Sequence, residues 1–405
     1  MTLRDKVAIA GIGSTPYYKR GQSVPQTMVE MAGKATLAAF DDAGLSLDEL
    51  DGFALYCGPS VDPAAMATQL GIPDIGFAAS VTGGGGGSAG SLGLGAAAIV
   101  SGQADVVVSL VTLQQTAHRL GGTSSGPREV PVGRGGEGGG EAGVSPDLAF
   151  TGPAGIIAPG HNFAMIANRH MYEYGTTREH FAEICIAQRD NAIRRPTSLM
   201  RTPLTMDDYF AARMICEPMC LFDCCLESDG AAAVVMVSAE RARDLKQPAV
   251  LISGATGGGR GDHASLHTYF QMPAESFASA GNRSVARRVY EMAGVGPSDI
   301  DVALLYDHFS PMVLMQLEDY GFCPVGEGGP FVADGHIRWP DGSLPVNTHG
   351  GHLSEGYLLG MTHVLEAVEQ LRGTAINQVK DAGVALVTGG PSAIPMSAAI
   401  LRRDS

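Results

Sequence analysis

The sequence contains an internal duplication, and this feature constrains the fold more than any other. Residues 35–55 (ATLAAFDDAGLSLDELDGFAL) correspond to residues 285–305 (VARRVYEMAGVGPSDIDVALL), and residues 96–111 correspond to residues 367–387. Each copy predicts a helix, then a turn or break, then a continuous apolar strand. Helices that alternate with such strands are typical of α/β proteins in which helices cover both faces of a largely parallel sheet.

The duplication predicts two similar halves, residues 1–245 and residues 246–405. Their opening strands, residues 7–13 and 250–257, also correspond loosely. A duplicated βαβαβ unit of this kind makes a pseudo-dimer within one chain, with the boundary between the two units near residues 240–250.

The first half is longer because it carries an insertion at about residues 117–218. Residues 121–160 are rich in Gly and Pro and predict an extended loop or lid. Residues 162–194 have the apolar periodicity of helices, and Thr177 followed by Glu179 marks a helix N-terminus.

The composition of the chain excludes several classes of function. The 405 residues are 45% hydrophobic and 17% charged, with a net charge of −15, which argues against general nucleic-acid binding. The apolar run 90–100 is too short and too rich in Gly to span a bilayer. Residues 1–18 predict a strand and not a signal peptide, so we expect a cytoplasmic protein.

Seven cysteines, an odd number, indicate reduced thiols. Four of them, Cys216, Cys220, Cys224 and Cys225, lie close together in the sequence, which raises the alternative of a metal site. Their spacing differs from the C-x2-C pairs of zinc sites, and no His follows at ligand distance. Since cysteine is among the most buried residue types, we favour buried thiols over a metal site.

Four segments in order resemble the thiolase superfamily over nearly the whole chain: residues 101–110, 174–193, 228–236 and 346–373. Three motifs, NTHGG, LSEGYLLGM and YDHFSP, resemble most closely the lipid-transfer branch related to sterol carrier protein x. The resemblance implies a thiolase fold with five layers, αβαβα, with the loop and helical insertion in the first half. It also implies a homodimer.

Departures from the thiolase pattern decide the expected chemistry. The nucleophilic Cys of a thiolase falls on Gly85, its Asn on Tyr306, its His on Tyr357 and its second, acid/base Cys on Val387. Thiolysis or Claisen condensation by that route needs a thiolate and a group that transfers its proton. The sequence therefore excludes ordinary thiolase chemistry.

A retro-aldol cleavage needs no nucleophile. It needs a group that removes a hydroxyl proton, donors that hold the thioester enolate, and a proton for that enolate. The branch includes aldol lyases of steroid side-chain degradation, which this chain resembles in carrying Tyr306 and Tyr357, so we expect these tyrosines to be the proton-transfer pair. The alternative is that both are structural. A phenol needs a helper to act as a base at neutral pH, and the candidates are Asp307, His308, His349 and His352.

Glycines 83–87 allow two interpretations, a flexible turn before a helix or a close approach of backbone N–H groups to the substrate. In the second, Gly85 also leaves room for a steroid ring. The predicted oxyanion and substrate-binding residues are Gly85, Gly86, His349, Gly350 and Gly390. We expect Ser88 to be a helix cap and not a substitute nucleophile, and His363 to be a packing or capping residue.

Together with these residues, the resemblance implies a carbon–carbon lyase that cleaves a bulky 3-hydroxyacyl-CoA, such as a steroid side-chain thioester, into a ketone and a short acyl-CoA. The CoA thioester is substrate, and we expect no metal and no permanently bound cofactor. The resemblance further implies a separate small subunit, an OB-fold protein with a zinc ribbon. Two alternatives stay open: a non-catalytic acyl-CoA- or lipid-binding scaffold, and a thiolase-type acyltransferase that works with a partner.

Overall fold

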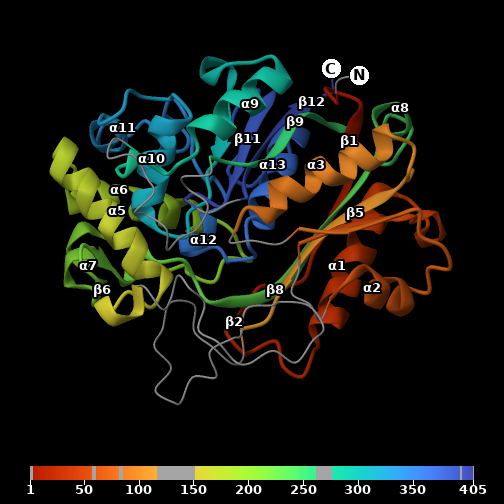
Figure 1. The fold of residues 1–405 in the computed structure, drawn as a ribbon, viewed down its shortest axis with the longest axis horizontal. Helices are drawn as coiled ribbons and strands as arrows, with labels where there is room; N and C mark the ends of the chain where they lie inside the picture. Colours follow the sequence, from red (N-terminus) through yellow and green to blue (C-terminus); the bar gives the residue numbers. More distant parts are fainter. Residues whose placement is uncertain are drawn as a thin grey trace.

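The computed structural model describes residues 3–56, 61–81, 85–115, 151–260, 276–392 and 395–404. A ten-stranded sheet runs through the molecule (Figure 1). Its strands follow the order β10-β11-β12-β9-β1-β8-β5-β3-β4, and the short strand β2 (Tyr18–Lys19) pairs with β8. Both parallel and antiparallel pairs occur, so the sheet is mixed.

The two halves repeat the same succession of elements. The first half contains β1 (Val7–Ser14), α1 (Met28–Ala43), β3 (Gly52–Leu55), α3 (Gly87–Val100), β5 (Val107–Leu113) and β8 (Ser228–Ser238). The second contains β9 (Val250–Gly258), α9 (Arg283–Ala293), β10 (Val302–Leu304), α13 (Met361–Arg372), β11 (Val384–Gly389) and β12 (Met396–Arg403). The duplication predicted from the sequence is therefore present in the structure.

The match extends to local detail. The first helix of each half ends at a glycine in the left-handed region, Gly44 with φ 73° and Gly294 with φ 70°. A 3-10 turn follows in each copy, η1 (Leu47–Glu49) and η7 (Pro297–Asp299), and leads into the strand. Glycine accepts this backbone conformation without the steric cost that a Cβ brings, so both copies stop the helix in the same way.

The five layers expected from the resemblance are also present. Helix α1 packs on β1, β8 and β5, and helix α9 packs on β9 and β12. Helix α3 contacts β3 and β5 of the first half and β9 and β12 of the second, so it lies between the two half-sheets, next to α13 (Figure 1). Because this central position leaves little room, α3 is built largely from Gly, Ala and Ser.

The half-sheets join where β1 pairs with β9, through Ala8 with Leu251 and Ile9 with Val250. The chain passes from one half to the other between α8 (Ala239–Ala242) and β9. At the far end of the first half-sheet, β4 (Phe77–Ser80) pairs with β3, and α2 (Pro63–Leu70) precedes it.

The described part of the insertion is helical, as predicted. It contains α5 (Pro159–Tyr174), α6 (Arg178–Ile193) and α7 (Met206–Ala211), and the small hairpin of β6 (Met214–Cys216) and β7 (Met219–Cys220) follows. Thr177 is the N-cap of α6. Most of the predicted Gly- and Pro-rich loop, up to residue 150, lies outside the described residues.

Helix α6 faces the second half. It packs against α10 (Ser310–Asp319), α11 (Gly328–Ala333) and the single turn α12 (Gly351–Ser354). The insertion thus supports the segment that carries the NTHGG and LSEGYLLGM motifs. Within the described residues, no helix is both long and apolar enough to cross a membrane.

The cysteines of the described chain are free thiols, as expected. Cys220 is buried, whereas Cys216, Cys224 and Cys225 are partly exposed, so the expectation of burial is too strong for three of the four. The sulfur atoms of Cys224 and Cys225 are nevertheless largely enclosed by protein: burial raises the pKa of Cys224 to about 12 and that of Cys225 well above its ordinary value, which disfavours their thiolates. In the part of the chain that the structure describes, no group of cysteines has its sulfur atoms placed for a metal.

Candidate active site

Two tyrosines meet at the centre of the molecule. Tyr306 follows β10, and Tyr357 lies between α12 and α13; their hydroxyl oxygens are 2.9 Å apart although 51 residues separate them. Tyr306 is 2% exposed and Tyr357 is 7% exposed. The structure therefore brings the two predicted proton-transfer residues into direct hydrogen-bond contact.

Backbone hydrogen bonds fix both tyrosines. The N–H of Tyr306 donates to the Thr388 hydroxyl at 2.8 Å, and the Gln316 amide donates to the Tyr306 carbonyl at 2.8 Å. The Ser228 hydroxyl accepts the N–H of Tyr357 at 2.8 Å and donates to its carbonyl at 3.0 Å. Strands or helices carry all three partners, so the hydroxyl pair is attached to rigid elements.

The glycine at the thiolase cysteine position makes room for Tyr306. Gly85 has φ +92°, and a Cβ there would lie 2.6 Å from the Tyr306 hydroxyl oxygen and 2.8 Å from its Cζ. The expectation that this space could receive a steroid ring is therefore wrong, because the phenol fills it. A Cys and the tyrosine cannot both occupy this place.

A third tyrosine, which the sequence reasoning missed, lies beside the pair. The hydroxyl of Tyr56 accepts the N–H of Gly85 at 2.6 Å, and a Cβ on Gly87 would lie 2.0 Å from the Tyr56 ring. Tyr56 follows β3 as Tyr306 follows β10, in the matching sequences GFALY (52–56) and VALLY (302–306). The internal duplication was thus the signal that could have found it.

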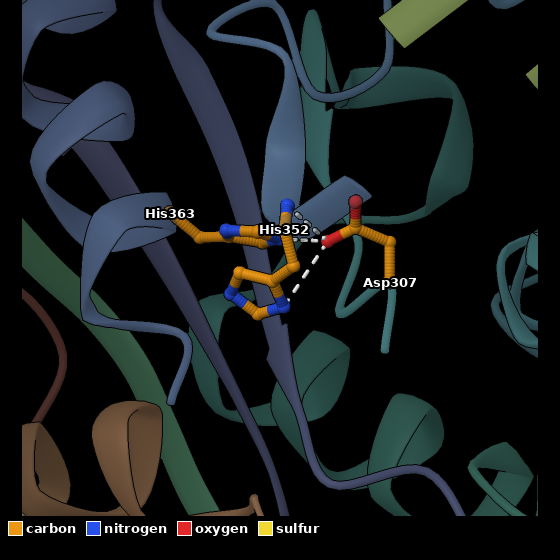
Figure 2. Close-up of side chains that lie close together, drawn as sticks. All are labelled: Asp307, His352 and His363. Carbon is orange, nitrogen blue, oxygen red and sulfur yellow. Dashed lines mark hydrogen bonds and ion pairs between the residues drawn. The ribbon is translucent and has the colours of Figure 1, made fainter. Parts of the chain in front are cut away.

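Asp307 organises the histidines around the pair. Its carboxylate oxygens accept the backbone N–H groups of His352 and Leu353 at 3.0 and 3.1 Å, at the start of α12. Its Oδ1 also lies 3.2 Å from Nδ1 of His352 and 3.1 Å from Nε2 of His363 (Figure 2). The His352 ring packs edge-to-face on both Tyr306 and Tyr357, with centroids 4.7 and 4.9 Å away.

Asp307, His352 and His363 offer ligand atoms within 4.8 Å of one another, a spacing that a metal ion could use. Nε2 of His363, however, lies 2.9 Å from the Leu305 carbonyl, a contact that suits an N–H donor and not a metal-bound nitrogen. We interpret the group as a hydrogen-bond network. His363, expected to be a packing residue, is thus one of its central members.

The remaining helper candidates lie on either side of this network. Nε2 of His349 is 3.2 Å from Nδ1 of His363, so His349 reaches the tyrosines only through other side chains. The His308 ring packs at 4.3 Å from Phe163 and 5.3 Å from Tyr306, and burial lowers its pKa to about 3. Burial also lowers the pKa of His349 and His352 well below the ordinary value. These imidazoles are neutral at physiological pH and can accept protons only transiently.

The predicted oxyanion residues separate into two groups. Gly85, Gly86 and Gly390 lie together, since a Cβ on Gly390 would come within 2.4 Å of the Gly86 nitrogen. Gly350 is elsewhere: its N–H donates to Asn347 at 2.8 Å, and its α-carbon faces Ala192 of α6. The Gly350 N–H is therefore not available as an oxyanion donor, which corrects that expectation, and the Gly85 N–H is already bound to Tyr56.

Ser88 is not the helix cap that the sequence predicts. The N-cap of α3 is Gly86, and Ser88 is the second helical residue. Its hydroxyl donates to the Leu359 carbonyl at 2.6 Å and so ties the first half to the loop of Tyr357. A hydroxyl held in this way is a structural link and a poor nucleophile.

Burial also controls the state of the tyrosines. It raises the pKa of Tyr306 and of Tyr357 well above the ordinary value, and the neighbouring Tyr56 adds to this in both cases. Both phenols therefore carry their protons at neutral pH. A tyrosine here can remove a substrate proton only if it gives up its own proton in the same event.

Comparison with known proteins places the chain in a family. Residues 262–403 match the model of the thiolase C-terminal domain-like family. A "steroid side-chain-cleaving aldolase" from Thermomonospora curvata is 38% identical over 98% of both chains. The chain belongs to the thiolase superfamily. Its place there is the branch that contains this aldolase and a Mycobacterium tuberculosis "17-hydroxy-3-oxo-4-pregnene-20-carboxyl-CoA lyase", which is 38% identical over 98% of this chain and 100% of that protein.

Solved structures of thiolase-superfamily proteins agree with this placement. A solved "Ltp2-ChsH2(DUF35) aldolase" has a TM-score of 0.88 and 36% identity, and the match covers 100% of this chain and 99% of that one. A monomeric "SCP2-thiolase like protein type 1" from Mycobacterium smegmatis has a TM-score of 0.71 at 20% identity, over 100% of this chain and 78% of that one, which shows the shared thiolase fold.

Proposed function

We propose that this enzyme is a retro-aldolase that cleaves a bulky 3-hydroxyacyl-CoA into a ketone and a short acyl-CoA, without an acyl-enzyme. The observation that carries the proposal is the contact of 2.9 Å between the Tyr306 and Tyr357 hydroxyls, beside a glycine at the thiolase cysteine position. Relative to a thiolase, the nucleophilic Cys is replaced by Gly85, and two tyrosine hydroxyls in contact with each other lie at the same site.

The proton balance of this reaction fits two touching hydroxyls. The substrate hydroxyl loses a proton, the Cα–Cβ bond breaks, and its electron pair passes into the thioester enolate, whose α-carbon then takes up a proton. One tyrosine accepts the hydroxyl proton while it donates its own to the other, and the second tyrosine protonates the enolate carbon. The proton moves from oxygen to carbon with no net exchange with solvent and no lasting phenolate.

Asp307 and His352 support this transfer. Asp307 accepts the backbone N–H of His352 at 3.0 Å and lies 3.2 Å from Nδ1 of its ring, so the carboxylate holds in place a ring that packs on both tyrosines. Both ring nitrogens of His352 are buried without a hydrogen-bond partner among the described residues, which leaves the ring available to exchange a proton with the site. His308 contributes a wall of the site next to Tyr306. Gly86 and Gly390, packed against each other, are the backbone candidates for holding the thioester oxygen.

The substrate class follows from the relatives. The two relatives at 38% identity are named for steroid side-chain cleavage and for a steroid carboxyl-CoA. We infer a tertiary 3-hydroxyacyl-CoA with a fused-ring acyl group for this enzyme, with the CoA thioester as substrate and no permanently bound cofactor.

Two assemblies are part of the proposal. The solved relative named for two components, one of them DUF35, supports a small partner subunit, for which we expect an OB-fold with a zinc ribbon. A homodimer is supported by the edge strand β4, where partly buried and exposed residues alternate and the described chain pairs the strand on one side with β3. A cytoplasmic location stays a prediction of the sequence.

The decisive experiment incubates the chain and its partner subunit with a tertiary 3-hydroxyacyl-CoA and detects the ketone and propionyl-CoA by mass spectrometry. A scaffold that only binds acyl-CoA would retain the thioester and release neither product. A thiolase-type acyltransferase would instead consume free CoA with a 3-oxoacyl-CoA. Either result would replace the lyase proposal.

A further inference from the structure

A buried ionic cluster lies behind the active site, and the chemistry above does not use it. Arg195, just past α6, donates from Nε to Glu355 at 2.8 Å and from Nη1 to Glu366 at 2.8 Å and Glu369 at 3.1 Å. The side chains of Glu355 and Glu366 are each 1% exposed. We call these four residues the Arg195 cluster.

The Arg195 cluster has more carboxyl groups than its single cation can balance. Among the residues that the structure describes, the other titratable groups that face Glu355 are His349, whose Nε2 is 3.8 Å from Glu355 Oε2, and Tyr17. Neither supplies positive charge, since burial lowers the pKa of His349. Buried charge is costly unless it is paired. Accordingly, burial raises the pKa of Glu355 to about 8 and that of Glu369 to about 7.

The cluster is attached directly to the segment that carries Tyr357. Glu355 lies two residues before Tyr357, and its carbonyl accepts the N–H of Leu199 at 2.9 Å. The carbonyl of Ser354 accepts the N–H of Met200 at 3.0 Å, so both the backbone and the side chain of this segment are held by residues 195–200, which follow α6. Through His349, Glu355 also reaches His363 and the Asp307 network.

From this geometry we propose that Arg195 and Glu355 are positioning residues for Tyr357, and that the excess of carboxyl groups around Arg195 makes the reaction sensitive to pH. At neutral pH the cluster holds an additional proton and its charges balance more closely. When that proton is lost, Glu355 repels Glu366 and Glu369, and segment 354–357 shifts away from the position that sets the contact between Tyr357 and Tyr306.

The proposal rests on the function proposed above and concerns the same site. None of the four residues has to touch the substrate for the effect to occur. The expected change is therefore in kcat, with KM nearly unaltered, because the hydroxyl contact and not the binding of the CoA thioester depends on the segment.

The test compares wild type with Glu355→Gln in the complex with the partner subunit. Gln reproduces the shape of the protonated carboxyl and cannot lose a proton, so the variant should keep kcat within about twofold at pH 7. Between pH 7 and pH 9 wild-type kcat should fall by about tenfold, since a group with a pKa near 8 is about nine-tenths ionised one unit above it. The same decline should be much smaller in Glu355→Gln.

The matched control is Asp42→Asn, which neutralises a carboxylate paired at 2.8 Å with Arg372, another mostly buried arginine. It should leave the pH profile of kcat as in wild type. A wild-type pH profile in Glu355→Gln would overturn the positioning proposal.

Two outcomes separate this inference from the proposed function. Full activity of Tyr357→Phe would refute the tyrosine mechanism, whatever Glu355→Gln does. An inactive Tyr357→Phe together with an unaltered Glu355→Gln profile would refute the positioning role alone. Thermal unfolding gives a readout that needs no activity. The folded-state pKa values of Glu355 and Glu369, about 8 and about 7, lie above their ordinary 4.5, so wild type should lose stability as pH rises from about 4.5 to about 8, and Glu355→Gln should lose less.

Discussion

The ends of strands β3 and β10 are equivalent positions in the two halves, yet they contribute differently to the site. Each strand is followed by a tyrosine, Tyr56 and Tyr306, and each tyrosine reaches the glycines at the start of α3. Tyr306 meets Tyr357 hydroxyl to hydroxyl, whereas Tyr56 accepts a backbone N–H from Gly85. The duplication supplied two similar phenols, and the surroundings of each have given it a separate task.

The two helices that follow the site continue this contrast. Helix α3 of the first half begins with glycines that provide space, and helix α13 of the second half is preceded by Tyr357 and carries His363. The first half thus provides the space at the start of α3, and the second half provides the side chains of the tyrosine pair and the histidines beside it. The following changes test that division, beginning with the largest expected effect.

Removing either hydroxyl of the tyrosine pair should cause the largest loss. Tyr306→Phe and Tyr357→Phe each break the 2.9 Å contact and interrupt the proton path, so kcat should fall by about 10²- to 10⁴-fold, the range for a lost general acid or base. Steady-state kinetics with the partner subunit present would measure this.

The control for the pair is Tyr290→Phe, which removes a hydroxyl that donates to the Tyr320 carbonyl at 2.9 Å outside the site. Its kcat should stay near that of wild type. A similar loss in Tyr290→Phe would mean that the pair contributes by packing and not by proton transfer.

Restoring a side chain at position 85 should have the next largest effect. In Gly85→Ala the new Cβ meets the Tyr306 phenol at about 2.6 Å, and the residue must adopt φ +92°, so we expect about 1–3 kcal/mol of destabilisation. Displacing the phenol should lower kcat by about 100-fold, as misplacement of a catalytic group by about 1 Å does.

Gly85→Cys extends this test, because it restores the residue type that a thiolase has at this position. We expect it to lose lyase activity and to gain no thiolysis, since Tyr357 and Val387 occupy the positions at which a thiolase has its histidine and its second cysteine. Thiolysis of a 3-oxoacyl-CoA by Gly85→Cys would show that the tyrosines can serve a thiolase mechanism.

The sequence sufficed for the parts of the site where a resemblance or a repeat assigns a role to a position. Tyr306 and Tyr357 could be paired in advance because both fall on thiolase catalytic positions. Tyr56 could not be found in that way, since the thiolase pattern assigns no role to its position and Tyr56 lies one residue beyond the repeated segment 35–55. The sequence signal for Tyr56 is that it corresponds to Tyr306 at the position that follows Leu55 and Leu305 in the repeat.

The contacts that escaped prediction are those between layers. Two examples are the contact of His363 Nε2 with the Leu305 carbonyl and the gathering of three carboxyl groups around Arg195. Both depend on how α6 and α13 pack in the folded protein, and no local sequence pattern encodes that packing. Gly350 was misplaced for a similar reason: it neighbours His349 in the sequence, but its α-carbon turns toward α6. Helix and strand positions were predictable because periodicity encodes them directly.

Tyr56→Phe should have an intermediate effect, because it leaves the pair intact and removes the acceptor of the Gly85 N–H. A buried N–H without a partner costs about 1–3 kcal/mol of stability. If about 1.4 kcal/mol of this is lost from the transition state, kcat falls about tenfold. Chemical denaturation would measure the loss of stability of this variant, and steady-state kinetics would measure its loss of kcat. A fall in kcat as large as that of Tyr306→Phe would mean that the tyrosines of the two halves contribute equally to catalysis.

The smallest effect should come from Ser88→Ala, which cuts a link between the halves. The Ser88 hydroxyl holds the carbonyl of Leu359, a residue with φ 51°, in the loop that follows Tyr357. We expect about 1 kcal/mol of destabilisation and a two- to threefold lower kcat, since the loop is also held by Ser228. The matched variant is Ser91→Ala, one turn along α3, whose hydroxyl bonds Ser88 and Ser109 of its own half. If Ser91→Ala lowers kcat as much as Ser88→Ala does, the first half acts through general stability and not through its contact with the tyrosine loop.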